Sequence, residues 1–329
     1  MGLLAALLAC TDAFTERGEP TPAGVDDAPP FPTSRTPVDW PFSAASPWNL
    51  PVGGDLALEE ADGPCTRAVR DPSVDAWVNA ETWSHPVARA AVDDPVVEIW
   101  EDGAFATRIA VPADAQPSLP AWPEGDAHLH ILDPDAGQVT ELWHARPRQE
   151  GGWEADSLAF NDLRGTGVGT EGVRIYGGSG FAGLWRAGEA RTGAWHALAL
   201  SLPLGALAPR YVWPATDLRT SRREDMLGPV PVGAHVVLPQ DVDLDAFTTP
   251  EGRALARTLR DYGAYVVDHA RGFALYAEPG AEGEVEGMRA DIDALRARLR
   301  CSTNNLPTQA GGPGPRVQPL APDFVDEEG

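Results

Sequence analysis

Lysine is absent from this chain of 329 residues, and each of its 25 basic residues is an arginine. The absence of lysine excludes Schiff-base catalysis and any phosphate-binding loop that depends on a lysine. Cysteine occurs only three times, without the close spacing that a zinc site needs. Several classes of enzyme and metal protein are therefore excluded before any motif is considered.

Positive charge is scarce as well, because 49 acidic residues outnumber the 25 arginines and leave a formal net charge of −24. A binder of the nucleic-acid backbone needs a basic surface, so we expect no nucleic-acid partner. Glycine and proline, in contrast, are abundant, with 34 and 32 residues. Together they form about one fifth of the chain against a usual share of about 12%, which disfavours a helical bundle.

The first ten residues resemble the end of a bacterial lipoprotein signal. An apolar run from Gly2 to Ala9, too short to span a bilayer, leads directly to Cys10. We expect residues 1–10 to be a signal remnant, Cys10 to carry a lipid, and the protein to be exported to the bacterial cell envelope. Membrane contact would then be made only through this lipid. The alternative is an ordinary secretory signal with a chance cysteine.

The two remaining thiols, Cys65 and Cys301, can form one disulfide in an exported chain. The bond would close a loop of more than 200 residues and tie the end of the last predicted helix to the early core. The alternative is a pair of buried free thiols.

Composition divides the rest of the chain into three parts. Residues 11–38 are rich in proline and poor in apolar side chains, which predicts a disordered tether. Residues 302–329 are rich in glycine, proline and acid, and we expect a second disordered segment there. The β-rich core domain is expected over residues 39–301.

Most of the core alternates between apolar and polar residues and is punctuated by turns, which is typical of strands. Two hairpins are predicted, 96–100 with 106–111 and 128–132 with 139–144. Further strands are expected at 173–176, 195–202, 211–213, 233–238, 264–268 and 273–277. Many short strands at close spacing predict a mainly β fold, a single β-sandwich or jelly-roll-like domain.

Two peripheral α-helices are expected beside the strands. Thr248 or Thr249 can cap the first, which has Pro250 in its first turn and Gly263 as its stop. The second is predicted over about 284–300. Its apolar residues follow helical spacing and predict a face docked on the core; they are Val285, Met288, Ile292, Leu295 and Leu299.

The second hairpin holds the most informative polar residues. A turn centred between residues 135 and 136 pairs His130 with Glu141 and His128 with Trp143. Alternation then places all four side chains on one face of the sheet. This face could line a sugar-binding groove with a His/Glu pair for proton transfer. The alternatives are a solvent-facing polar face or a buried hydrogen-bonded pair.

His196 begins an otherwise apolar strand, which is typical of a core histidine as well as of a catalyst. If it met His128 and Glu141 in space, the three side chains could bind a divalent metal. No other cofactor is expected. His85 has no comparable neighbours in the sequence, and Ser179 lies in a glycine-rich segment without the spacing of a hydrolase nucleophile.

The ordered motifs of the core resemble an uncharacterised family of exported proteins from actinobacteria and myxobacteria. The motifs are Ser46-Pro-Trp-Asn49, Asp126-x-His128, Glu141-Leu-Trp143, His196-Ala-Leu198, Trp213-Pro-Ala215, Gly228 to Gly233 and Tyr262-Gly with Asp268. They span most of residues 40–280. The chain departs from the family pattern at Ala127, where an arginine is frequent, and at 176–181. The resemblance implies no activity.

We therefore expect a carbohydrate-active enzyme, a polysaccharide lyase or hydrolase. His128 or His196 would be the acid or base, Glu141 its partner, and Asp126 a second carboxylate for hydrolysis. Substrate would be bound by a charge-neutralising arginine, an aromatic platform and three residues of the family-like segments, which are Arg174, Trp143, Trp213, Tyr262 and Asp268. The alternative is a non-catalytic surface module that binds glycan or protein through tryptophans such as Trp48, Trp143, Trp185 and Trp213.

Overall fold

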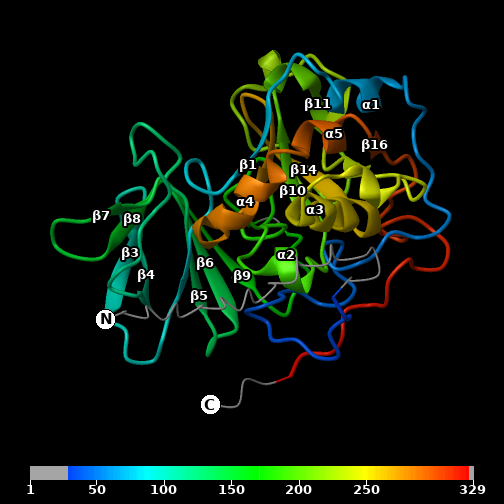
Figure 1. Cartoon of the computed structure of the whole chain (residues 1–329). Helices are drawn as coiled ribbons and strands as arrows, with labels where there is room; N and C mark the ends of the chain where they lie inside the picture. The colour runs from blue at the N-terminus through cyan, green and yellow to red at the C-terminus, as the bar shows by residue number, and fades with distance from the viewer. Residues whose placement is uncertain (1–28, 170, 326–329) are drawn as a thin grey trace, which may run out of the picture.

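The computed structural model describes residues 29–169 and 171–325 and is mainly β, as the sequence predicts (Figure 1). Three sheets of four or more strands form its framework, together with one two-stranded sheet. In Figure 1 the sheet that contains β3, β4, β7 and β8 lies on the left, and β5, β6 and β9 lie between it and the helical part. The expected lipidation site and most of the expected tether lie outside the described residues.

The central sheet has six strands in the order β1-β15-β10-β14-β13-β16 and mixes parallel with antiparallel pairing. Strands β10 and β15 are buried along their whole length, because both faces of the sheet are covered. The bounds are β1 Ala76–Asn79, β10 Leu198–Leu202, β13 His235–Val237, β14 Ala264–His269, β15 Phe273–Tyr276 and β16 Arg300–Cys301.

The second sheet has the order β2-β5-β6-β9 and contains the predicted hairpin. Its bounds are β2 Val87–Arg89, β5 Leu129–Asp133, β6 Gln138–Trp143 and β9 Ser157–Asp162. His130 pairs with Glu141, as the turn predicts. The polar face does not meet solvent, because Leu132 and Val139, which share it, belong to the main hydrophobic core. Position 130 therefore lies between the sheets.

The opposite face of this hairpin packs on the third sheet, β4-β3-β8-β7. Leu129, Ile131 and Leu142 meet Ile99 and Ala155 in a second, smaller core. The bounds are β3 Val96–Glu101, β4 Ala104–Ala110, β7 Arg146–Pro147 and β8 Trp153–Ala155. The two faces of one hairpin thus separate two cores, which agrees with the sandwich arrangement expected from the sequence.

The smallest sheet pairs β11 (Leu207–Tyr211) with β12 (Val230–Val232). Four 3-10 helices complete the connections, at Leu204–Ala206, Arg223–Asp225, Leu244–Ala246 and Pro279–Ala281. The strand expected at 173–176 is wrong, because these residues form bends and turns rather than pairing with a neighbour.

The described residues contain five α-helices rather than the two expected. They are α1 Pro64–Val69, α2 Glu189–Thr192, α3 Pro250–Asp261, α4 Glu282–Met288 and α5 Ile292–Arg296. Thr249 caps α3 by accepting from the Gly252 amide at 2.9 Å, as predicted. The helix expected over 284–300 is divided between α4 and α5, because Asp291 turns toward α3 and accepts from the amides of Thr248 and Thr249. Its apolar stripe is nevertheless buried as predicted.

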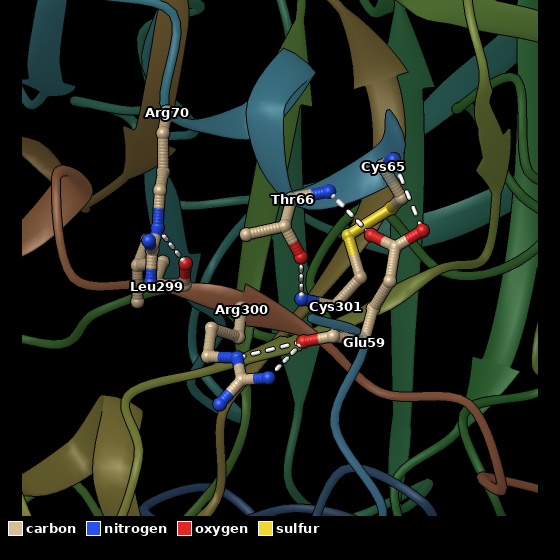
Figure 2. Close-up of a disulfide and its surroundings, with 7 residues drawn as sticks. All are labelled: Glu59, Cys65, Thr66, Arg70, Leu299, Arg300 and Cys301. Carbon is tan, nitrogen blue, oxygen red and sulfur yellow. Dashed lines mark hydrogen bonds between the residues drawn. A yellow bond between two sulfur atoms is a disulfide. The ribbon is translucent and has the colours of Figure 1, made fainter. Parts of the chain in front are cut away.

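The expected disulfide between Cys65 and Cys301 is confirmed, with the two Cα atoms 6.1 Å apart (Figure 2). It joins α1 to β16 at the edge of the central sheet. Glu59 accepts from the Thr66 amide at 2.7 Å at the start of α1, where negative charge favours the helix. No helix among the described residues has the length and apolar character needed to cross a membrane.

The segments on both sides of the expected core are more structured than composition predicts. Residues 302–325 pack on the molecule, where Arg316 donates to the carbonyls of Pro51 and Ala310. Arg35, which lies within the expected tether, stacks on Phe324 with its guanidinium carbon 3.9 Å from the ring centre. These segments have little apolar area, and arginine bonds to carbonyl groups hold them together with backbone hydrogen bonds such as that from Val317 to Val52. The expected disordered tail is therefore corrected for residues 302–325.

Candidate functional site

A cavity of about 990 Å³ opens between the central sheet and the β5–β6 hairpin. Its wall includes residues of β1 and β15, the segment before β5, and the turns at 172–175 and 268–271. Of the nine residues predicted to act in catalysis or substrate binding, five line this cavity. They are Asp126, His128, Trp143, Arg174 and Asp268. The volume and the mixture of aromatic and charged walls suit a ligand larger than one sugar ring.

A chain of hydrogen bonds joins Arg174 and His85 of this wall to His130 behind it. Arg174 donates to Nε2 of His85 at 2.8 Å, and Nδ1 of His85 lies 2.8 Å from Nε2 of His130. Because a guanidinium only donates, Nε2 of His85 must be the acceptor, and its proton must be on Nδ1. His130 then accepts on Nε2 and carries its own proton on Nδ1. Arg174 thereby fixes the tautomers of both neutral rings.

A third imidazole, His128, stacks on His85 with ring centres 4.2 Å apart. Its Nδ1 is buried without a hydrogen-bond partner, and the residue borders the cavity. Burial, followed by the charges of His130 and Arg174, lowers the pKa of His128 well below its usual value. A neutral imidazole at the cavity wall is suited to accept a proton.

The same environment keeps the other two rings neutral. Burial and the Arg174 charge lower the pKa of His130 to about 3 and that of His85 well below its usual value. Buried cations are expensive unless they are paired, so three neighbouring histidines beside an arginine avoid the charged form.

Two carboxyl groups, Asp126 and Asp268, line the same cavity. Burial raises the pKa of Asp126, and it also raises the pKa of Asp268, where the charge of Asp126 adds a smaller effect in the same direction. A carboxyl group whose pKa is raised can hold a proton nearer to neutral pH and then donate it. The cavity therefore combines neutral bases with carboxyl groups suited to act as acids.

Glu141 lies behind this wall and does not line the cavity. Its carboxylate accepts from the Ser179 hydroxyl, from the Gly180 amide at 2.6 Å, from the Phe181 amide at 3.5 Å and from Asn161 at 3.1 Å. Burial raises the pKa of Glu141 to about 7, and these donors oppose the rise. Glu141 is therefore a positioning residue, which holds the 179–181 turn against the hairpin rather than touching a substrate.

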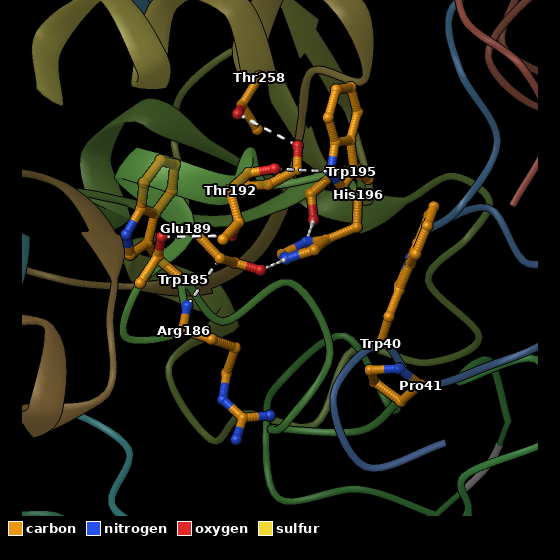
Figure 3. A network of polar contacts seen from close by, with 12 residues as sticks. Trp40, Pro41, Trp185, Arg186, Glu189, Thr192, Trp195, His196 and Thr258 are labelled. Atoms are coloured by element: carbon orange, nitrogen blue, oxygen red, sulfur yellow. Dashed lines mark hydrogen bonds and ion pairs between the residues drawn. The ribbon is translucent and has the colours of Figure 1, made fainter. Parts of the chain in front are cut away.

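His196 is not near these groups, which corrects its expected catalytic role. Its Nε2 lies 2.9 Å from Glu189 and its Nδ1 lies 2.9 Å from the Ala197 carbonyl (Figure 3). Both neighbours are acceptors, so the ring donates twice and is an imidazolium. Burial alone would lower the pKa of His196, but the charge and hydrogen bond of Glu189 raise it above its usual value. This pair is structural.

The predicted metal ligands His128, Glu141 and His196 are therefore not brought together. Instead, the ligand atoms of His85, His128 and His130 all lie within 4.8 Å of one another. This set does not fit a divalent cation while Arg174 is in place. A metal on Nδ1 of His85 would displace its proton while Arg174 still donates to Nε2, and the guanidinium adds positive charge beside the ion.

Two further predicted residues also lie outside the cavity. Tyr262 is buried at the end of α3, and its hydroxyl has no hydrogen-bond partner. Trp213 is half-buried beside the β11–β12 sheet, where it precedes a cis proline. Neither side chain borders the cavity, so the structure does not bring them to this site.

Sequence reasoning missed His85 and Tyr276. His85 precedes β2, and only the parallel pairing of β2 with β5 brings it to His130. The Tyr276 ring lies under Arg174, with the guanidinium carbon 4.0 Å from its centre. No local pattern predicts either contact.

No protein-family model matches the chain, and no curated protein or solved structure is similar to it.

Proposed function

We propose that the protein is a carbohydrate-active enzyme that cleaves a polysaccharide by acid–base catalysis in the cavity. One observation carries this proposal: neutral His128 lines the same cavity as Asp126 and Asp268, and that cavity is large enough for several sugar units. Lyases and hydrolases both need a base and an acid within reach of the bond that breaks.

The roles follow from the chemistry of each group. His128 is the base, because it lines the cavity and its lowered pKa keeps the ring in the neutral form that can accept a proton. Asp126 or Asp268 is the acid, because burial raises the pKa of each. Trp143 lies in the cavity wall beside Asp126 and offers a stacking surface for a sugar ring.

The second candidate, a non-catalytic glycan-binding module, is supported by the aromatic part of the wall. Trp77, Trp83 and Trp143 all border the cavity. A binding module does not need neutral bases and proton-holding acids in the same wall, however, and those groups favour the enzyme.

A screen of polysaccharides tests both candidates. Reducing ends and unsaturated ends are measured after incubation with the wild-type protein and with His128→Ala. We expect one polysaccharide to be cleaved by the wild-type protein and not by the variant. If no polysaccharide is cleaved but one is retained in affinity electrophoresis, the binding module is the correct function.

We also propose that the protein is exported and anchored by a lipid on Cys10, as a member of the family that its motifs resemble. The disulfide supports export, since such bonds persist in oxidising compartments. Cys10→Ser should move the protein from the membrane fraction to the soluble fraction. Membrane association that survives this substitution would contradict lipidation at Cys10.

A further inference from the structure

Arg174 is a buried cation in the cavity wall, and some of its hydrogen-bond donors have no partner. The side chain is 2% exposed, and its NH2 group donates to His85 at 2.8 Å and to the Gly180 carbonyl at 3.2 Å. The remaining guanidinium nitrogens, Nε and NH1, are buried without any hydrogen-bond partner. Leaving such donors unpaired is costly, and Arg174 belongs to the cavity wall. These donors are buried in the wall of the unliganded cavity, so an acceptor satisfies them only if the Arg174 side chain turns toward the cavity.

The charge of the cavity differs from that of the whole chain. The wall includes five arginines and four acidic side chains, while the chain carries a net charge of −24. The arginines are Arg174, Arg219, Arg222, Arg271 and Arg289. Arg271 is exposed and has no ion pair within residues 29–169 and 171–325. Arginine is also the residue best suited to grip a planar carboxylate through two parallel bonds. Arg219, Arg222 and Arg289 already have acidic partners, so Arg174 and Arg271 are the wall arginines left without an ion pair among the described residues, and they indicate an anionic ligand.

We infer that the polysaccharide is built from uronic acids, that Arg174 binds the carboxylate of the unit being cleaved, and that cleavage is a β-elimination. This inference rests on the proposed function and narrows it. The carboxylate would pair with the unpaired guanidinium donors of Arg174, while Arg271 would meet the charge of another unit at the mouth of the cavity.

The elimination uses only groups that the cavity holds. His128 removes the proton from the carbon that bears the carboxylate, and Arg174 stabilises the negative charge that spreads onto the carboxylate oxygens. That electron pair forms a carbon–carbon double bond as the adjacent carbon–oxygen bond to the next sugar breaks. Protonated Asp126 or Asp268 gives its proton to the leaving oxygen. The step needs no water, oxidant or reductant.

Carboxylate binding also explains how an acid can stay protonated in this cavity. Asp126 and Asp268 are close enough for the charge of one to affect the other. A third negative charge brought by the substrate disfavours ionisation of both. The substrate thus helps to keep its own proton donor in the protonated form.

The first experiment compares matched substrates. Polygalacturonate, alginate and a glucuronan are each supplied as such and after carboxyl reduction, which keeps the backbone and removes the charge. We expect at least one acidic polymer to give unsaturated ends, detected by ultraviolet absorbance, and its reduced form to be inert. Cleavage of a neutral polymer, or reducing ends without unsaturation, would overturn the inference but leave the proposed function standing.

The second experiment measures binding, so that it does not depend on turnover. The affinity of an oligouronate for the full chain is measured by calorimetry. We expect Arg174→Met to weaken it by about tenfold to a hundredfold, the range for a lost charged hydrogen bond, and Arg174→Lys to restore part of it. Arg108→Ala, an exposed change on β4, is the matched control.

Because Arg174 is buried, Arg271→Ala provides a second variant in case the first one fails to fold. We expect this change to weaken oligouronate binding and to reduce its dependence on salt. Oligouronate affinity that is unmeasurable in the wild-type protein, or that neither variant changes, would overturn the inference. Neither of these results would contradict an acid–base enzyme that acts on a neutral glycan.

Discussion

Two groups of buried histidines in this protein lie in opposite electrostatic settings. His196 has an acceptor at each ring nitrogen, so the ring is positively charged and its hydrogen bonds are complete. His85 accepts from Arg174, so it is neutral, and Nδ1 of both His128 and His130 lacks a partner. The complete network stabilises the fold, whereas the incomplete one lines a cavity and has capacity left for a ligand. Unpaired buried nitrogens in the residues of a cavity wall, those of Arg174 and His128, thus mark the candidate site, whereas histidine content alone does not.

The largest expected difference between the two groups is in turnover, and it appears when one histidine is removed from each. His128→Ala should lower turnover of the polysaccharide found in the screen by about 10²- to 10⁴-fold, the usual contribution of a general base. His196→Ala should leave the turnover of the folded protein unchanged, because its ring is committed to Glu189. Initial rates are measured below the unfolding transition of each variant. Equal losses in both variants would remove the distinction between the two groups.

The free energy of unfolding should change in the opposite order, with a larger loss at the His196 pair than at His128. Glu189→Gln leaves the His196 imidazolium without its buried partner, and we expect unfolding to become easier by about 3 kcal/mol in urea titrations. His128→Ala breaks no side-chain hydrogen bond, so it should cost less. A smaller loss for Glu189→Gln than for His128→Ala would contradict the structural role of the pair.

The same pair predicts a dependence of stability on pH. The pKa of His196 is raised in the folded state, so the folded protein binds the proton more tightly than the unfolded chain does. The stabilisation is complete below the ordinary histidine pKa of about 6.5 and is lost as the pH rises through the folded value. Urea unfolding measured across this range should show that loss in the wild-type protein and a flatter curve in Glu189→Gln.

The sequence predicts the hairpin register because a turn and a strict alternation act together. Pairing of His130 with Glu141 follows from those local features, and the cap at Thr249 follows from local chemistry as well. Long-range contacts do not follow from such local features. His85 reaches His130 only through the parallel pairing of a three-residue strand, and nothing in its neighbourhood requires that pairing.

The C-terminal segment, residues 302–325, also depends on long-range contacts that local sequence does not predict. Composition predicts disorder where apolar residues are few, because little apolar surface is available to offset the chain entropy. Residues 302–325 are held instead by arginine donors that satisfy distant carbonyl groups, such as Arg316 on Pro51. The positions of those carbonyls depend on the completed fold.

The hydrogen bonds between Glu141 and the 179–181 turn support the cavity wall from behind, and removing one of them should affect both stability and turnover. Ser179→Ala removes one donor to a buried carboxylate and should destabilise the fold by about 2 kcal/mol. It should also lower turnover modestly, because the 179–181 turn supplies the Gly180 carbonyl that Arg174 contacts. Ser179→Thr keeps the hydroxyl and is the matched control. A stability loss with fully unchanged kinetics would show that Glu141 supports the fold alone.

The smallest expected effect concerns the hydrogen-bonded chain from Arg174 through His85 to His130, which sets the tautomers of the two rings. Arg174 lowers the pKa of His130 to about 3, together with burial, which is the larger cause. Removing the guanidinium in Arg174→Met should therefore move this pKa upward without restoring it fully, as measured by nitrogen-15 shifts of the imidazole. A group with a lowered folded pKa stabilises the protein above its unfolded pKa, and that stability is lost as the pH falls toward the folded value. Raising the folded pKa reduces this loss, so Arg174→Met should be less sensitive to acid than the wild-type protein. An unchanged His130 titration would mean that burial alone keeps the ring neutral, and that Arg174 serves the ligand rather than the histidines.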